Sequence, residues 1–296
     1  MIPRSVLKIV SSLGFGLWLL LVSFSAVDRA NAQQPAPAQS PTPTITAPRD
    51  VKARVTETLI DSSIPDDPAL DQMLTAFSPK VRALDIVIGR LKGELRKGGM
   101  GAGPLGNFVT DGMRTQASAK LGKRIDLSIM NGGGLRRNTI SEGELRARDI
   151  FELLPFENAL VTLDLSGEQI LKLLGVVVSS REAQSGARLT YITKTDKSSQ
   201  LETAMLRDEQ GREKEIDPKA SYTIVTIDYL VNVGGERYSV LREGRNTKLV
   251  GITLRDAIMD YVKSETAAAR EIKPRLDERF ILDRANSVPS GEAPPK

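Results

Sequence analysis

Apolar residues recur at helical spacing in several parts of the chain. After Pro68 they follow one another three or four residues apart, and Asp66 or Asp67 is available to cap this helix. Pro79 is expected to kink or restart the helix, because a proline ring does not fit inside a regular helix. The same spacing predicts further helices over 106–121, 149–154, 170–178 and 254–263.

Shorter apolar runs between these helices predict strands. They cover 125–130, 159–165, 188–193, 201–206, 222–227 and 279–282. Ser166, followed three residues later by Gln169, is suited to cap the helix over 170–178. Because helices and strands mix without strict alternation, we predict an α+β fold, with a mixed sheet and flanking helices.

The first 32 residues predict an export signal. Arg4 and Lys8 precede a long apolar segment, which ends in Ala30-Asn-Ala32, an A-x-A cleavage pattern. The alternative is an uncleaved anchor, since the apolar segment is long for a signal and near the lower limit for a membrane span. Both interpretations predict a periplasmic or extracellular location for the folded part.

This pattern divides the chain into four predicted regions. They are a signal peptide (1–32), a Pro/Ala-rich disordered linker (33–51), a folded domain (52–284) and a disordered tail (285–296).

Composition excludes several classes of function. The 296 residues contain no histidine and no cysteine, whereas dinuclear metallophosphatases and hydrolytic zinc sites use these residue types. We therefore predict no catalytic residue, no metal ligand and no cofactor in this chain, and we do not expect it to hydrolyse substrates alone. Its 41 cations nearly balance its 37 anions and form no basic cluster, which disfavours a nucleic-acid polymer as partner.

A run of three glycines follows the predicted strand over 125–130. Successive glycines allow positive φ angles and let backbone N–H groups approach a ligand closely. Arg136, just after the run, has a forked guanidinium suited to phosphate or carboxylate. The alternative is a tight turn followed by solvated arginines.

Two further segments combine aromatic and polar residues. A base could stack on Phe156, and Asn158 could donate to and accept from the base edge. Tyr229 could form the opposite wall, and Glu236, after Gly234 and Gly235, could accept from ribose hydroxyls. The alternatives are a core phenylalanine with a turn asparagine, and a loop with a half-buried tyrosine.

Together these segments resemble the C-terminal domain of 5′-nucleotidases and related exported nucleotide and UDP-sugar hydrolases. The matching segments are 105–114 (LGNFVTDGMR), 131–136 (NGGGLR), 155–158 (PFEN), 185–187 (SGA) and 234–238 (GGERY). The resemblance covers about residues 52–284. In that family this domain binds the nucleoside end of the substrate, and a separate N-terminal domain carries two metals.

The resemblance implies a set of ligand-binding residues: Arg136, Phe156, Asn158, Gly186, Tyr229, Gly234, Gly235 and Glu236. Phe156 and Tyr229 would hold the base, Gly186 would line the pocket, and Arg136 would contact the charged part of the ligand.

Two departures leave the pocket open to question. Arg237 replaces a glycine of the family pattern and could intrude on the pocket. One extra residue before Gly234 leaves open whether Tyr229 or Leu230 forms the second wall.

Two functions are compatible with the sequence. The first is an exported nucleotide- or nucleoside-binding domain that acts in nucleotide hydrolysis and catabolism only together with a separate metallophosphatase chain. The alternative is a non-catalytic structural or interaction module that retains the fold but has lost the ligand pocket.

Overall fold

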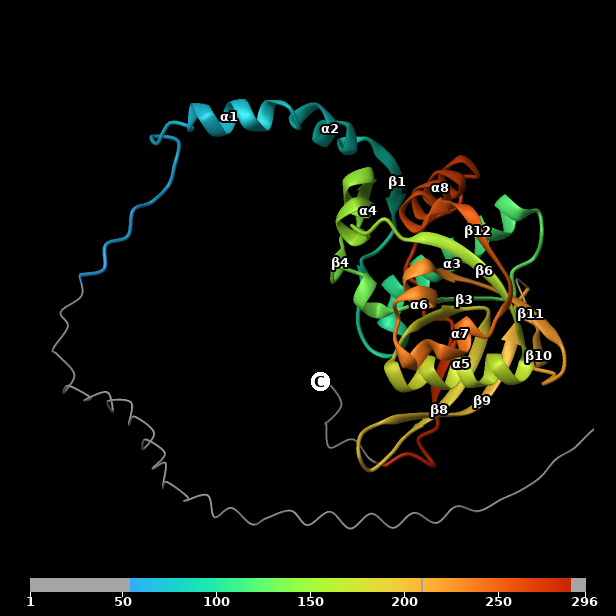
Figure 1. Ribbon diagram of the computed structural model, residues 1–296. Helices are drawn as coiled ribbons and strands as arrows, with labels where there is room; N and C mark the ends of the chain where they lie inside the picture. Colours follow the sequence, from blue (N-terminus) through green and yellow to red (C-terminus); the bar gives the residue numbers. More distant parts are fainter. Residues whose placement is uncertain (1–53, 209, 289–296) are drawn as a thin grey trace, which may run out of the picture. The chain divides into compact units, whose positions relative to one another are not determined.

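The computed structural model describes residues 54–208 and 210–288 (Figure 1). The predicted signal peptide and linker, up to residue 51, therefore lie outside the described residues. Contacts divide the chain into two units, Met1–Ile64 and Pro65–Lys296. The described part of the first unit, residues 54–64, contains no helix or strand, so all elements below belong to the second unit.

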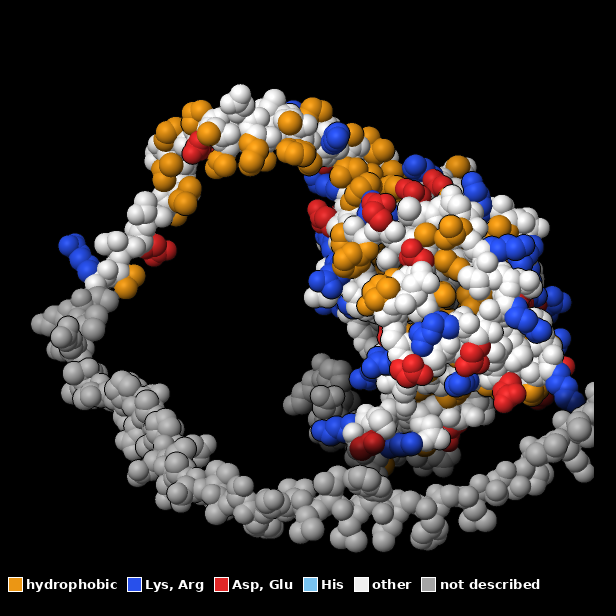
Figure 2. Space-filling model, in the orientation of Figure 1, with side chains coloured by type: hydrophobic (Ala, Val, Ile, Leu, Met, Phe, Trp, Pro, Cys, Tyr) orange, Lys and Arg blue, Asp and Glu red, His pale blue; other side chains and the backbone are white. Residues whose placement is uncertain are grey.

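Two short helices open the second unit: α1 (Pro68–Thr75) and α2 (Ser78–Arg82). The Asp67 carboxylate caps α1 by accepting from the Ala69 backbone N–H at 2.8 Å, and Pro79 lies in the first turn of α2. The sequence prediction of a capped helix that restarts near Pro79 is confirmed. None of the side chains described in these two helices is buried, and apolar side chains gather along their surface (Figure 2).

A mixed five-stranded sheet forms the centre of the second unit. Its order is β12 (Arg245–Thr253), β6 (Ala159–Ser166), β11 (Ser221–Ile227), β3 (Leu127–Met130) and β7 (Ala183–Ser185). Strand β11 runs parallel to β3, and the other neighbours pair antiparallel. All four residues of β3 are buried, as their apolar sequence requires. The predicted α+β fold with a mixed sheet is confirmed.

Helices pack on the sheet. Helix α3 (Gly103–Leu121) contacts β3, β7 and α8 (Leu254–Ala267), whereas α5 (Gly167–Ser180) contacts β6 and β9 (Ser199–Arg207). Ser166 and Gln169 form the capping box at the start of α5, as predicted: the Ser166 N–H donates to Oε1 of Gln169 at 2.9 Å. Buried aliphatic side chains from these helices and the sheet form one continuous core.

A second sheet and two small ribbons complete the fold. The second sheet has the order β10 (Glu213–Glu215), β9, β8 (Ala187–Thr193) and β13 (Phe280–Leu282). The ribbons pair β1 (Val87–Leu91) with β5 (Gly143–Arg146), and β2 (Leu95–Arg96) with β4 (Thr139–Ile140). The remaining elements are η1 (Ala83–Asp85), η2 (Met100–Ala102), η3 (Gly132–Gly134), α4 (Ala147–Leu153), α6 (Asp228–Asn232), η4 (Glu236–Tyr238) and α7 (Ser239–Arg242).

Near its C-terminal end, the described chain continues to pair with the second sheet. The Val288 backbone N–H donates to the Thr193 carbonyl at 2.9 Å, so hydrogen bonds to the second sheet continue beyond the predicted boundary at 284. No helix within residues 54–208 and 210–288 is both long enough and apolar enough to cross a membrane.

Candidate functional site

A cavity of about 330 Å³ opens where β3 ends. Three separate segments form its walls: the glycine-rich turn after β3, the loop before β6, and the first turn of α6. The described residues that line it are Asn131, Gly133, Gly134, Arg136, Phe156, Asn158 and Tyr229. Four of the residues predicted to bind ligand are thus brought together.

The glycine-rich turn forms η3, but not for the conformational reason expected. None of Gly132, Gly133 and Gly134 is among the described glycines with positive φ. An added Cβ at Gly134 would lie 2.6 Å from the Met130 methyl carbon, so this buried side chain would have to shift for a larger residue. The N–H of Gly132 points away from solvent and donates to the Glu182 carboxylate at 2.6 Å. Close packing therefore explains this turn better than positive φ does.

Phe156 lies on a loop that α8 holds in place. The Arg255 guanidinium donates to the carbonyls of Leu154 (3.0 Å) and Pro155 (2.9 Å) and to the Glu157 carboxylate (2.7 Å). Arg255 itself is buried, and its guanidinium carbon lies 4.3 Å from the centre of the Phe151 ring. The loop is therefore fixed while 48% of Phe156 remains exposed toward the cavity and solvent.

Arg136 brings positive charge to the edge of this cavity. Its backbone N–H donates to the Leu153 carbonyl at 2.9 Å, and its guanidinium carbon lies 5.7 Å from the centre of the Phe156 ring. Arg137, in contrast, forms salt bridges with Asp149 (2.8 Å) and Glu152 (3.1 Å). Of these two arginines, Arg136 is the one placed to meet an anionic ligand.

Tyr229 forms the wall contributed by α6. The Asp228 carboxylate accepts from the backbone N–H groups of Tyr229 (2.8 Å) and Ala159 (3.2 Å), which ties the start of α6 to the start of β6. Tyr229 is 45% exposed, whereas Leu230 is completely buried in the core. Of these two residues, Tyr229 is therefore the one that lines the cavity.

The loop after α6 does not reach the cavity in this structure. Gly234, Gly235 and Glu236 are absent from the described residues that line it, and so is Arg237. The Glu236 side chain is 92% exposed and pairs with Arg242 at 3.3 Å. Gly234 contacts the Tyr238 ring, where an added Cβ would lie 2.8 Å from a ring carbon. The expected acceptor for ribose hydroxyls therefore faces solvent instead.

A buried carboxylate connects this loop to the glycine-rich turn. The Tyr238 hydroxyl donates to Oε1 of Glu182 at 2.7 Å, and Oε2 of Glu182 accepts from Gly132. Burial, and then the hydrogen bond and charge of Glu182, raise the pKa of Tyr238 well above its usual value, so this phenol stays a donor even in alkaline solution. Sequence reasoning missed Glu182, because its partners lie 50 and 56 residues away.

Asn131 is a second residue for which sequence reasoning predicted no role of its own. Its side chain lines the cavity, and its buried Oδ1 has no hydrogen-bond partner among the described residues. A buried acceptor without a donor is costly, so a donor that reaches this oxygen would be stabilising.

Gly186 lies elsewhere, which corrects its expected position in the pocket. Ser185 pairs with Ser128, whereas Ala183 pairs with Met130 beside the glycine-rich turn. Gly186 therefore lies near the start of β3, where it lines a different cavity. Its φ of +108°, and an added Cβ at only 2.1 Å from the Asp126 carbonyl oxygen, explain why glycine is needed there.

Carboxylates do not gather around the cavity. Within the described part of the chain, no group of three or more Asp or Glu side chains is arranged to hold a metal ion. The chemistry that the site itself offers is stacking, amide recognition and one guanidinium.

Comparison with known proteins identifies the family. Residues 87–243 match the family model described as the 5′-nucleotidase C-terminal domain. The match covers more than half of the chain, and the chain therefore belongs to this family. The resemblance seen in the sequence is confirmed.

Relatives extend the comparison to the remainder of the domain. Protein UshA of Yersinia enterocolitica is 25% identical over 240 residues, which cover 77% of this chain and 38% of that protein. The structure of the 5′-nucleotidase precursor from Thermus thermophilus is 28% identical with a TM-score of 0.61, over 74% of this chain and 44% of that one.

A more distant structure supports the fold alone. Haemophilus influenzae NAD nucleotidase is 18% identical with a TM-score of 0.55, over 75% of this chain and 42% of that one. The chain thus spans about two fifths of the length of these relatives.

Proposed function

We propose that this chain is an exported nucleotide- or nucleoside-binding domain of the 5′-nucleotidase type. The observation that carries the proposal is the cavity in which Phe156, Tyr229, Asn158 and Arg136 meet. Two half-exposed aromatic side chains in one cavity offer stacking faces for a flat heterocycle. Membership of the 5′-nucleotidase C-terminal domain family supports the same ligand class.

Four of the lining residues have a role in this proposal. The base stacks between Phe156 and Tyr229, Asn158 binds the base edge, and Arg136 contacts the phosphate of a nucleotide. Stacking on an aromatic side chain is worth about 1–3 kcal/mol per base, so two walls and a few hydrogen bonds support roughly micromolar to millimolar affinity. Gly234, Gly235 and Glu236 enter the site only if their loop moves toward the cavity on binding.

Hydrolysis, in this proposal, requires a separate metallophosphatase chain. A chain without histidine or cysteine lacks the usual ligands of a hydrolytic metal centre. The purified chain is therefore expected to release no phosphate from AMP with Mn²⁺, Mg²⁺ or Zn²⁺ added. Co-purification from the native envelope tests the partner: a histidine-rich metallophosphatase travelling with this chain would support the split enzyme.

Export is proposed from the N-terminal sequence. The Arg4 and Lys8 pair, the apolar segment and the A-x-A pattern ending at Ala32 support a cleaved signal peptide. Mass spectrometry of the native protein tests this directly: a mature chain that begins at Gln33 is expected, and an intact Met1 would indicate an anchor.

The alternative function is a structural or interaction module that keeps the fold without a working pocket. The exposed position of Glu236, outside the cavity, is the observation in its favour.

Calorimetric titration separates the two functions. The chain without its signal is titrated with adenosine, AMP and UDP-glucose. The binding proposal expects saturable heat with at least one ligand, and tighter binding of AMP than of adenosine if Arg136 contacts phosphate. No heat with any of them up to millimolar concentration would support the non-binding module.

A further inference from the structure

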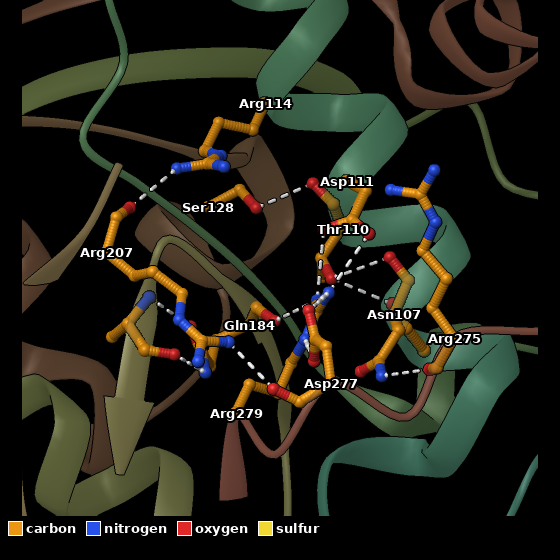
Figure 3. A network of polar contacts seen from close by, with 12 residues as sticks. Asn107, Thr110, Asp111, Arg114, Ser128, Gln184, Arg207, Arg275, Asp277 and Arg279 are labelled. Atoms are coloured by element: carbon orange, nitrogen blue, oxygen red, sulfur yellow. Dashed lines mark hydrogen bonds and ion pairs between the residues drawn. The ribbon is translucent and has the colours of Figure 1, made fainter. Parts of the chain in front are cut away.

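A second cavity, of about 300 Å³, is lined by four arginines (Figure 3). Arg114 comes from α3, Arg207 from the end of β9, and Arg275 and Arg279 from the segment that leads into β13. Three aspartates, Asp111, Asp208 and Asp277, also line it. No role in nucleoside binding accounts for so many guanidinium groups in one place.

This arginine cavity lies at the opposite end of β3 from the stacking cavity. Ser185 and Gly186, which line the arginine cavity, are next to Ser128 and Asp126 near the start of β3. The stacking cavity begins at Asn131, just beyond the other end of the strand. The two cavities share no lining residue among the described part of the chain.

Arg279 pairs with two of the three aspartates. It is buried, and its two terminal nitrogens each lie 3.0 Å from an oxygen of Asp111. Asp277 accepts two more of its hydrogen bonds, each at 2.8 Å. Burial alone would raise the pKa of Asp277, but the hydrogen bond and charge of Arg279 lower it below its usual value. Both carboxylates are thus already committed to Arg279.

The third aspartate is also compensated. Asp208 accepts from the side chain of Arg212 at 2.7 Å and from two backbone N–H groups of its own turn. The described lining thus carries four guanidinium groups and three carboxylates, a net charge of +1, and all three carboxylates already have arginine partners.

Arg207 has an unsatisfied donor. One terminal nitrogen donates to the Asp277 carbonyl at 2.7 Å, and the other lies 3.4 Å from Glu213. Its Nε is buried and has no hydrogen-bond partner among the described residues. A buried guanidinium N–H without an acceptor is unfavourable, and an anion's oxygen is a strong acceptor for it.

Arg275 is held at the rim by its backbone. Its carbonyl accepts from the side chain of Asn107, a buried residue of α3, at 2.8 Å. The guanidinium makes no hydrogen bond or salt bridge with any described residue, and Figure 3 shows it extended away from the network of Arg279. The Arg275 guanidinium therefore adds positive charge to the cavity, and no hydrogen bond or salt bridge to a described residue explains its presence there.

Gly186 makes room for the remaining arginine. An added Cβ at Gly186 would lie 3.0 Å from Nη1 of Arg114, and the same nitrogen is 3.5 Å from the Arg207 carbonyl. The hydroxyl-bearing residues Thr115 and Ser185 also line the cavity and add neutral donors.

We propose that the arginine cavity is a binding site for a phosphate-type oxyanion, either free or as the terminal phosphate of a larger molecule. Guanidinium groups contributed by a helix, a strand end and a loop suit a tetrahedral anion with oxygens in several directions better than a planar carboxylate. The site is separate from nucleoside binding and does not depend on it.

Titration of the chain without its signal with sodium phosphate, at constant ionic strength, tests the proposal. Saturable binding is expected in the wild type, with sulfate as a competitor and succinate much weaker. Glycerol phosphate tests the second source: affinity equal to that of phosphate indicates that the anion can be part of a larger molecule.

Variants locate the bound anion. Arg207→Gln and Arg275→Gln are each expected to weaken phosphate binding at least tenfold. Arg148→Gln is the matched control, because Arg148 is an exposed arginine on α4 that pairs with Asp85 and lies outside the cavity. If Arg207→Gln fails to fold, Arg275→Gln decides, since its side chain makes no structural bond to a described residue.

Three outcomes would overturn the proposal. They are no phosphate binding by the wild type at millimolar concentration, equal phosphate affinity of Arg275→Gln and the wild type, or displacement of bound phosphate by chloride. Phe156→Ala should bind phosphate like the wild type, so failure of nucleoside binding and failure of anion binding can be told apart.

Discussion

Phe156 and Tyr229 each leave almost half of their side chains exposed, although aromatic side chains gain much from burial. The backbone around them, in contrast, is held: Arg255 donates to the carbonyl of Pro155, just before Phe156, and Asp228 accepts from the N–H of Tyr229. A rigid backbone that presents an exposed ring is suited to binding, because little conformational entropy is lost when the ligand arrives.

The first prediction concerns Phe156. Phe156→Ala should weaken nucleotide binding by about 1–3 kcal/mol, or roughly 5- to 150-fold, because one stacking face is lost. The free energy of unfolding should change by less than about 1 kcal/mol, since the side chain packs only partly against the protein. Calorimetry and urea unfolding measure the two effects.

Phe77→Ala is the control for this prediction, because Phe77 is 59% exposed and lies outside the cavity. Unchanged nucleotide affinity in Phe156→Ala would show that this ring takes no part in binding. A stability loss of several kcal/mol would show that the ring serves the core instead.

Sequence reasoning found the residues of the site that a local motif contains. Arg136, Phe156, Asn158 and Tyr229 were all suggested by short segments and meet in one cavity. Glu182 and Arg255 were missed, since each acts through partners at least 50 residues away. Gly186 was misplaced because a motif glycine reveals a backbone requirement but not which cavity it faces.

Tyr261 provides a prediction about alkaline pH. Burial, followed by the negative charges of Asp111 and Glu265, raises its pKa to about 12, although Arg275 and Arg270 act in the opposite direction. Between pH 10 and 12 the unfolded chain therefore loses the phenolic proton before the folded protein does. The free energy of unfolding should fall as pH rises, by at most about 1.4 kcal/mol per pH unit from this group.

Urea unfolding of Tyr261→Phe and wild type across pH 8–12 measures this contribution. The variant should lose stability less steeply above pH 10, while other groups affect both proteins alike. Parallel stability curves for the two proteins would contradict the assignment to Tyr261.

At the scale of elements, α8 connects the core to the stacking cavity. Its apolar residues Ala257, Ile258 and Val262 are buried, whereas Arg255 in its first turn reaches the loop that carries Phe156. One helix thus supplies both packing and the hydrogen bonds that fix a ligand-binding loop.

Arg255→Lys tests this connection. A lysine keeps the charge but cannot bind the Leu154 and Pro155 carbonyls together with Glu157 through a planar fork. The free energy of unfolding should fall by about 1–3 kcal/mol, because buried carbonyls lose donors. Nucleotide affinity should fall as well, since the loop that carries Phe156 is no longer held.

Arg148→Lys is the control for Arg255→Lys, because that arginine pairs with Asp85 at an exposed position. Hydrogen exchange of residues 154–158 gives a direct measure of loop order. Unchanged exchange in Arg255→Lys would mean that Phe156 is positioned by other contacts.

The longer helices and the inner strands followed from sequence periodicity, but α6, α7 and β12 did not. This nine-residue strand pairs only with β6 and lies at the edge of the sheet, so its first five residues are exposed and its sequence is largely polar. Over these five residues no face is buried, so there is no alternation of apolar and polar residues to recognise. Strand β11, which has neighbours on both sides, showed the apolar pattern clearly.

At the scale of the whole molecule, the stability of the second unit should not depend on its first two helices. Leu70, Met73, Leu74, Phe77 and Val81 are all more than half exposed, and none of the described side chains of α1 and α2 is buried. The contiguous core begins only beyond them, with Leu84 packing against it and Ile88 inside it.

A chain that starts at Ala83 should therefore fold. It keeps Leu84 in the core and the Asp85 carboxylate as partner of Arg148, but loses exposed apolar surface that costs free energy in water. We expect its melting temperature to lie within a few degrees of that of the longer chain, its nucleotide affinity to be unchanged, and its self-association to be weaker. Differential scanning calorimetry, titration and sedimentation velocity measure these three properties. A large drop in melting temperature would show that α1 and α2 bury apolar surface against the rest of the protein in solution, and unchanged self-association would show that their exposed apolar side chains take no part in it.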